Sequence, residues 1–180
     1  MKKLLSLLIA TLLISSCTSP AKVSAPGIVT SCDEIRLLES AEKSSTMACL
    51  DGSSEINFHQ LKGPLLINVW GSWCEGCKQE MPYFIELYQS QVFISGQIQM
   101  LGINVEEKSK EDAIDYIQKS GMSWPNLVDT SGISKSIFGP GVPVTWFIDE
   151  NGKNIETKIG AYTNKKQLFN QVEKAFGVKL

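Results

Sequence analysis

Short apolar runs alternate along the chain with segments whose apolar residues recur at helical spacing. The uninterrupted runs predict buried strands, and a recurrence every three or four residues predicts amphipathic helices. The predicted strands are residues 65–70, 99–105, 124–128 and 144–148. The predicted helices are residues 75 to about 91, 109–119, 131–138 and 164–176. Strands and helices therefore alternate over most of the chain.

This order of elements predicts an α/β domain with a mixed central sheet and helices on both of its faces. Helical crossovers join parallel strands, whereas the short turn at residues 149–152 joins strand 144–148 to an antiparallel partner at 153–159. Pro143 stands at the start of a predicted strand, a place compatible with an edge strand, a turn or a cis peptide bond. Periodicity does not choose among these three.

The first residues have the pattern of a bacterial export signal. A start with two lysines precedes the apolar stretch 4–14, which is too short to span a bilayer comfortably. The residues before Cys17 resemble a lipobox, which predicts cleavage in front of Cys17 and acylation of its thiol. Ordinary cleavage after Ala25 is the alternative, and Pro26 disfavours it. We therefore expect a signal peptide at 1–16, a flexible tether at 17–29 and a domain at 30–180.

Composition and charge narrow the classes of partner. The 180 residues are 43% hydrophobic, enough for one well-formed core. Loss of the leader lysines lowers the basic residues from 17 to 15 against 19 acidic ones, for a net charge near −4. Because no basic cluster is interleaved with aromatic residues, nucleic-acid binding is not expected.

Two thiols, Cys74 and Cys77, stand where a predicted strand gives way to a predicted helix. The free N–H groups of a helix start favour an anion, so a Cys74 thiolate is stabilised and can attack a disulfide. Cys77 lies on the same helical face and is positioned to resolve the mixed disulfide. The alternative, half of a zinc site, lacks a second close pair of ligands, since only His59 and two widely spaced cysteines remain. No metal and no cofactor are predicted.

Cys32 and Cys49 form the other pair once Cys17 is set aside. They flank a predicted helix from Asp33 to about Lys43, and export places them in an environment that permits oxidation. A structural disulfide that closes this loop would stabilise the domain by about 3 kcal/mol. A second redox pair is the alternative, but neither cysteine has the strand-to-helix setting that activates a thiol.

The motifs at residues 68–82 and 141–149, with Gly152 and Gly160 beyond them, resemble the thioredoxin superfamily and, more closely, the TlpA/ResA-like membrane-anchored thioredoxins of bacteria. The resemblance covers about residues 27–180. It implies a thioredoxin-like fold with an N-terminal extension and an extra helix–strand insertion. It also implies a substrate-binding surface in which a cis Pro143 packs against the active disulfide, with the backbone of Val142 and the ring of Trp73 beside it.

One position departs from ordinary thioredoxin. A buried Asp is expected six residues before the first cysteine, but Asn68 stands there and cannot take up a proton. The resemblance therefore assigns proton transfer and thiol tuning to Glu80, one turn after Cys77, and a tuning charge to Glu75. Carboxylates near a thiolate oppose its charge, so we expect a low-potential reductant.

Together these observations predict an extracytoplasmic, lipid-anchored thiol:disulfide oxidoreductase of the bacterial cell envelope. By resemblance, it would reduce disulfides in exported proteins such as apocytochrome c and receive electrons from a membrane thiol transporter of the CcdA or DsbD type. The glycine at position 76 leaves open an oxidase or isomerase of secreted proteins. A lipid-anchored binding module whose CxxC is only a structural disulfide is the remaining alternative.

Overall fold

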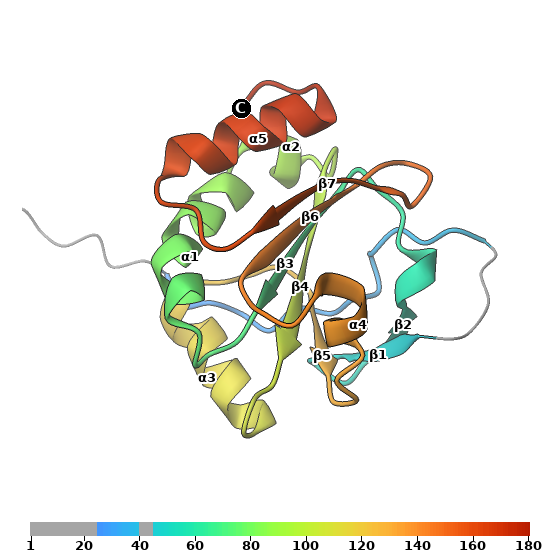
Figure 1. Cartoon of the computed structure of the whole chain (residues 1–180), viewed down its shortest axis with the longest axis vertical. Helices are drawn as coiled ribbons and strands as arrows, with labels where there is room; N and C mark the ends of the chain where they lie inside the picture. The colour runs from blue at the N-terminus through green and yellow to red at the C-terminus, as the bar shows by residue number, and fades with distance from the viewer. Residues whose placement is uncertain (1–24, 40–44) are drawn as a thin grey trace, which may run out of the picture.

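The computed structural model describes residues 25–39 and 45–180, and within them the chain forms a seven-stranded mixed sheet flanked by helices (Figure 1). The strands are β1 (Thr46–Cys49), β2 (Glu55–Asn57), β3 (Leu65–Trp70), β4 (Gln99–Val105), β5 (Asn126–Asp129), β6 (Val144–Ile148) and β7 (Asn154–Ile159). The helices are α1 (Glu75–Tyr88), α2 (Gln91–Ile94), α3 (Lys110–Ser120), α4 (Ser134–Phe138) and α5 (Lys165–Phe176), with a 3-10 turn η1 (Phe58–Gln60). The predicted α/β architecture, a mixed central sheet with helices on both faces, is confirmed.

The strand order is β2-β1-β5-β4-β3-β6-β7. The β3–β4 and β4–β5 pairs are parallel because α1 and α3 carry the chain back across the sheet. The β6–β7 hairpin is antiparallel, as the turn at 149–152 predicts, and β6 runs antiparallel to β3. β3 and β4 therefore lie at the centre of the sheet, and their carboxyl ends point to the same edge.

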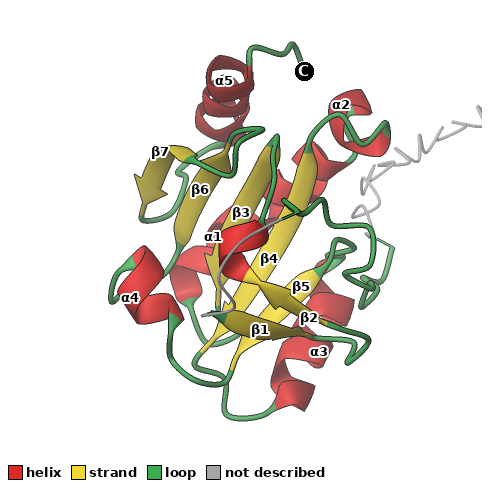
Figure 2. Cartoon of the chain, turned by 90° about the vertical axis from the view of Figure 1, so that its right-hand side faces the viewer, coloured by secondary structure: helices red, strands yellow, loops and turns green. Residues whose placement is uncertain are grey.

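Side-chain alternation along β3 divides the core into two layers. Leu66 and Trp70 face a cluster built with α1, α3 and α5, whereas Ile67 and Val69 face a second cluster that includes Phe138 of α4. The three longer helices thus cover one face, and α4 with the N-terminal segment covers the other (Figures 1 and 2). All six residues of β3 are buried, which explains why its sequence is an unbroken apolar run apart from Asn68.

The helix predicted from Asp33 to Lys43 is wrong over residues 33–39, which form turns and an isolated bridge. Long-range contacts override the local pattern. The Arg36 backbone N–H and side chain both donate to the Gln99 side chain, and the Leu38 N–H donates to the Gln60 carbonyl. Residues 40–43 of that prediction lie outside the described residues.

Four small elements were not predicted: β1, β2, η1 and α2. β1 and β2 form a short antiparallel ribbon, and β1 joins the main sheet through β5. A disulfide between Cys32 and Cys49, with a Cα–Cα distance of 6.0 Å, links the N-terminal segment to β1. Both cysteines are buried, which fits a structural bridge.

The expected signal peptide, Cys17 and most of the expected tether lie outside the described residues. Among the residues that the structure does describe, no helix is long and apolar enough to cross a membrane.

Replacement of both Cys32 and Cys49 by alanine should lower the free energy of unfolding by about 3 kcal/mol, because the unfolded chain regains the entropy of an open loop. Chemical denaturation in a Cys74→Ser, Cys77→Ser background measures this with no second disulfide present. An unchanged unfolding midpoint would show that the bridge contributes nothing to stability.

Candidate active site

The Cys74–Cys77 disulfide lies at the junction of β3 and α1, as the sequence predicts. Cys74 is the N-cap residue of α1, and its Sγ accepts a hydrogen bond from the Cys77 N–H at 3.1 Å. Cys74 is 5% exposed and Cys77 is fully buried. Of the two cysteines only Cys74 has any exposed surface, which fits it as the attacking cysteine and Cys77 as the resolving one.

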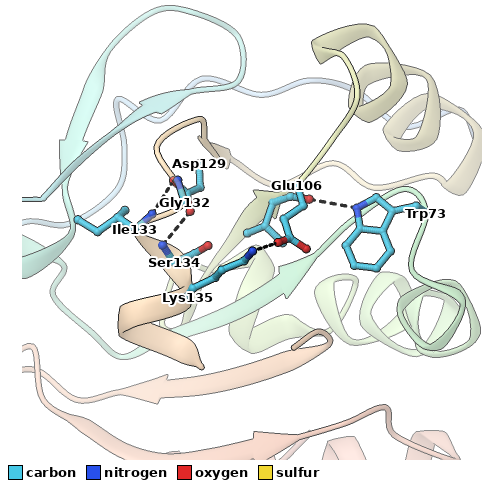
Figure 3. Close-up of polar contacts among 8 residues, drawn as sticks. Trp73, Glu106, Asp129, Gly132, Ile133, Ser134 and Lys135 are labelled. Carbon is cyan, nitrogen blue, oxygen red and sulfur yellow. Dashed lines mark hydrogen bonds and ion pairs between the residues drawn. The ribbon is translucent and has the colours of Figure 1, made fainter. Parts of the chain in front are cut away.

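The loop between β3 and α1 is held by residues at the end of β4. Glu107 accepts hydrogen bonds from the backbone N–H and the hydroxyl of Ser72 at 2.5 and 2.6 Å, and from the Asn104 side-chain amide at 2.8 Å. The Trp73 ring nitrogen donates to the Val105 carbonyl (Figure 3). Trp73, the residue before Cys74, is 48% exposed. Sequence reasoning missed Glu107, although its place just beyond the carboxyl end of a central parallel strand was a signal.

The peptide bond between Val142 and Pro143 is cis, as the resemblance implied. Pro143 is buried and Val142 is half-buried. A Cβ atom placed on Gly76 would lie 3.4 Å from Pro143 Cδ and 3.5 Å from Ala161 Cβ, so both residues line the wall beside the disulfide. The structure therefore brings together Trp73, Cys74 and the cis-proline loop.

Glu80 is a fully buried carboxyl group on α1, in the turn that follows Cys77. It accepts hydrogen bonds from the Asn68 amide at 3.2 Å and from the Tyr162 backbone N–H at 2.9 Å. Burial raises the pKa of Glu80 from 4.5 to about 7, against the opposing effect of these two hydrogen bonds and of the Lys158 charge. A carboxyl group with this pKa exchanges its proton readily near neutral pH.

Glu75 occupies the first turn of α1 and is exposed. Its charge complements the helix N-terminus, and its tuning of the thiols stays a prediction. No group of three or more His, Cys, Asp or Glu side chains suited to a metal ion occurs in the described part of the chain.

A second array of polar contacts supports α4, the helix that leads into the cis-proline loop (Figure 3). The Asp129 carboxylate accepts hydrogen bonds from the backbone N–H groups of Ser131, Gly132, Ile133 and Ser134. Although burial opposes ionisation, these bonds hold the pKa of Asp129 below its ordinary value. Lys135 of α4 forms an ion pair with Glu106. The sequence analysis did not identify this array.

Fold and site together define a thioredoxin-like protein that carries a CxxC disulfide at the start of a helix. The chain belongs to the AhpC/TSA family, whose model matches residues 41–156. It is 31% identical over 102 residues to the thiol-disulfide oxidoreductase ResA of Geobacillus thermodenitrificans, an alignment that covers 56% of this chain and 57% of the relative. The chain thus spans somewhat more than half of that relative's length.

Two solved structures share the fold. A secreted Mycobacterium tuberculosis disulfide oxidoreductase, described as homologous to E. coli DsbE, superposes with a TM-score of 0.61 at 19% identity and covers 72% of this chain and 94% of its own. The exposed lipoprotein thioredoxin Etrx1 of Streptococcus pneumoniae has a TM-score of 0.56 at 22% identity and covers 72% and 97%. The resemblance to ResA-like thioredoxins is confirmed.

The raised pKa of Glu80 predicts a pH-dependent stability of the oxidised protein. Between pH 4.5 and about 7 the folded state holds the Glu80 proton more tightly than the unfolded chain does, so stability falls as the pH rises through this window. Glu80→Gln should remove about 3 kcal/mol of this fall, measured by denaturation at pH 5 and pH 8. Parallel pH profiles for the two proteins would contradict the assignment.

Proposed function

We propose that this protein is a lipid-anchored, extracytoplasmic reductant of disulfides in exported proteins, with apocytochrome c as one substrate class. The observation that carries the proposal is the buried Glu80 carboxyl group behind a disulfide of which only Cys74 reaches the surface. This arrangement supplies an accessible nucleophile and a proton acceptor for the resolving thiol. The exposed Trp73 ring and the cis-proline wall offer a surface for a bound peptide.

The reduced form carries out the exchange in two steps. The Cys74 thiolate attacks one sulfur of the target disulfide, a Cys74–target bond forms, and the other target sulfur leaves as a thiolate that takes a proton. Glu80 then accepts the proton of Cys77, whose sulfur attacks Cys74 and releases the second target thiol. Two electrons have passed to the target, and the Cys74–Cys77 disulfide is restored.

Regeneration requires two electrons from outside the domain. We propose a membrane thiol transporter of the CcdA or DsbD type as the donor, on the strength of the ResA-like resemblance. The chain's own geometry is compatible with work at a membrane surface. Near the start of the described residues, the N–H groups of Gly27 and Ile28 donate to the carbonyls of Gln118 and Met122 beside the end of α3.

That end of α3 lies at the sheet edge opposite the active site. α3 carries the chain from the carboxyl end of β4 back to the start of β5, whereas Cys74 follows the carboxyl end of β3. A tether acylated at Cys17 would therefore attach on the far side of the domain and leave the disulfide facing away from the membrane. Etrx1, which shares the fold, is itself described as an exposed lipoprotein.

The redox potential separates a reductant from an oxidase. We expect a value at or below about −270 mV, because a negative Glu80 disfavours the thiolate form, whereas an oxidase would lie near −120 mV. Equilibration with glutathione or dithiothreitol at pH 8 measures it. Glu80→Gln is the matched variant, and it should shift the potential upward. A wild-type value near −120 mV would replace the proposal with an oxidase.

Trapping in cells that express the full chain tests catalysis itself. Cys77→Ala keeps the attacking thiol but cannot resolve, so it should accumulate mixed disulfides with exported proteins, which mass spectrometry identifies. Cys74→Ala is the control and should accumulate none. If neither variant traps a partner and the wild-type pair stays oxidised with every donor, the CxxC is a structural disulfide of a binding module.

A further inference from the structure

Lys158, at the end of β7, is a half-buried cation held by backbone carbonyl groups. Its Nζ donates to the carbonyl oxygens of Ile159 and Gly160, both at 2.7 Å, and to that of Ala161 at 3.4 Å. The same ammonium group lies 5.4 Å from the centroid of the Tyr162 ring. One side chain thus fixes a short stretch of backbone, residues 159–162, which we call the clamp segment.

The clamp segment contacts each part of the active site. The Gly160 N–H donates to the Pro143 carbonyl at 2.9 Å. Ala161 lies beside Gly76, which stands between Cys74 and Cys77 in the sequence. The Tyr162 N–H donates to the second oxygen of Glu80 at 2.9 Å. A displacement of this segment would therefore change the cis-proline wall, the packing beside the disulfide and the hydrogen bonding of Glu80 together.

We propose that Lys158 is the positioning residue of this active site: it holds the clamp segment so that the Tyr162 N–H reaches Glu80. The positive charge of Lys158 also favours the carboxylate form of Glu80. The consequence for turnover rests on the proposed function, in which Glu80 accepts the Cys77 proton. The electrostatic part does not depend on turnover. It can be measured in the oxidised protein alone.

The charge balance around Glu80 makes Lys158 its principal counter-charge. The titratable groups that face Glu80 are Cys77, which is in the disulfide, Tyr116 of α3 and Tyr162, while the Asn68 amide of β3 does not titrate. Burial raises the pKa of Tyr116 to about 12 and that of Tyr162 well above its ordinary value, so both phenols are neutral at physiological pH.

The remaining charges near this cluster are acidic. Glu75 lies close enough to Tyr116, and Glu156 close enough to Tyr162, to raise the pKa of those phenols further. Neither acid favours a second negative charge at Glu80. Among the residues that the structure describes, Lys158 is the one cation whose charge lowers the pKa of Glu80, against the larger effect of burial. Its removal should therefore leave Glu80 protonated to a higher pH.

The test is a titration of the Glu80 carboxyl carbon by NMR in the oxidised protein labelled with ¹³C-glutamate, with Glu80→Gln to assign the signal. Lys158→Met removes the charge and should move the Glu80 midpoint upward by roughly half a pH unit or more. Lys158→Arg keeps the charge and should stay near the wild-type midpoint. Lys158→Gln keeps a donor for the carbonyls without the charge, and should shift as Lys158→Met does.

An unchanged midpoint in both folded neutral variants would overturn the proposal, and Lys158→Gln serves where Lys158→Met fails to fold. The pH dependence of disulfide reduction provides the second readout. The pH below which the rate of disulfide reduction falls should be higher in the neutral variants, Lys158→Met and Lys158→Gln, and should return to the wild-type value in Lys158→Arg. If the NMR midpoint moves while this pH does not, Lys158 acts on Glu80 as proposed, but Glu80 is not the base of the proposed reaction.

Discussion

The burial of one carboxyl group organises this molecule. Glu80 has no exposed surface, and a buried carboxyl group is costly unless its oxygens find donors. Those donors come from Asn68 on β3 and from the Tyr162 backbone beyond β7, segments separated from Glu80 by 12 and 82 residues. The bonds fix α1 against the sheet and against the end of the hairpin. Two of these segments, β3 and α1, flank the disulfide, and the third carries Ala161, which lines the wall beside the disulfide together with Pro143.

The site is held at some cost to stability. The side-chain amide of Asn68 donates to Glu80. The Oδ1 atom of Asn68 is buried without a hydrogen-bond partner, which costs about 1–3 kcal/mol of stability. An apolar pair at positions 68 and 80 would pack without either penalty. The structure instead maintains a carboxyl group whose pKa is raised to about 7 one turn from the resolving cysteine. Such a conflict between stability and local chemistry is expected at a functional site.

The sequence predicted the elements that depend on local interactions and missed those that depend on contacts between residues far apart in the chain. β3 and α1 were predicted to within a few residues because a fully buried strand and an N-cap leave local signatures. Glu80, one turn after Cys77, was singled out by the resemblance to ResA-like thioredoxins. The helix at 33–43 failed because Arg36 and Leu38 bond to residues more than 20 positions away. Glu107 and Lys158 were missed for a related reason. Lys158 donates to backbone carbonyls, which leave no trace in residue identity, and Glu107 bonds Ser72 across 35 positions of sequence, through both its backbone N–H and its hydroxyl.

Within the proposed function, the placement of charge also orders the two steps of exchange. Cys74 sits at the N-cap of α1, where free backbone N–H groups favour its thiolate, whereas Cys77 is fully buried in the first turn. A carboxylate at Glu80 opposes a second negative charge nearby, so Cys77 keeps its proton while Cys74 is a free thiolate. Once Cys74 is bound to a target sulfur its charge is gone, and transfer of the Cys77 proton to Glu80 no longer gathers two thiolates in one site. Cys77 therefore becomes a nucleophile only after a target has been captured.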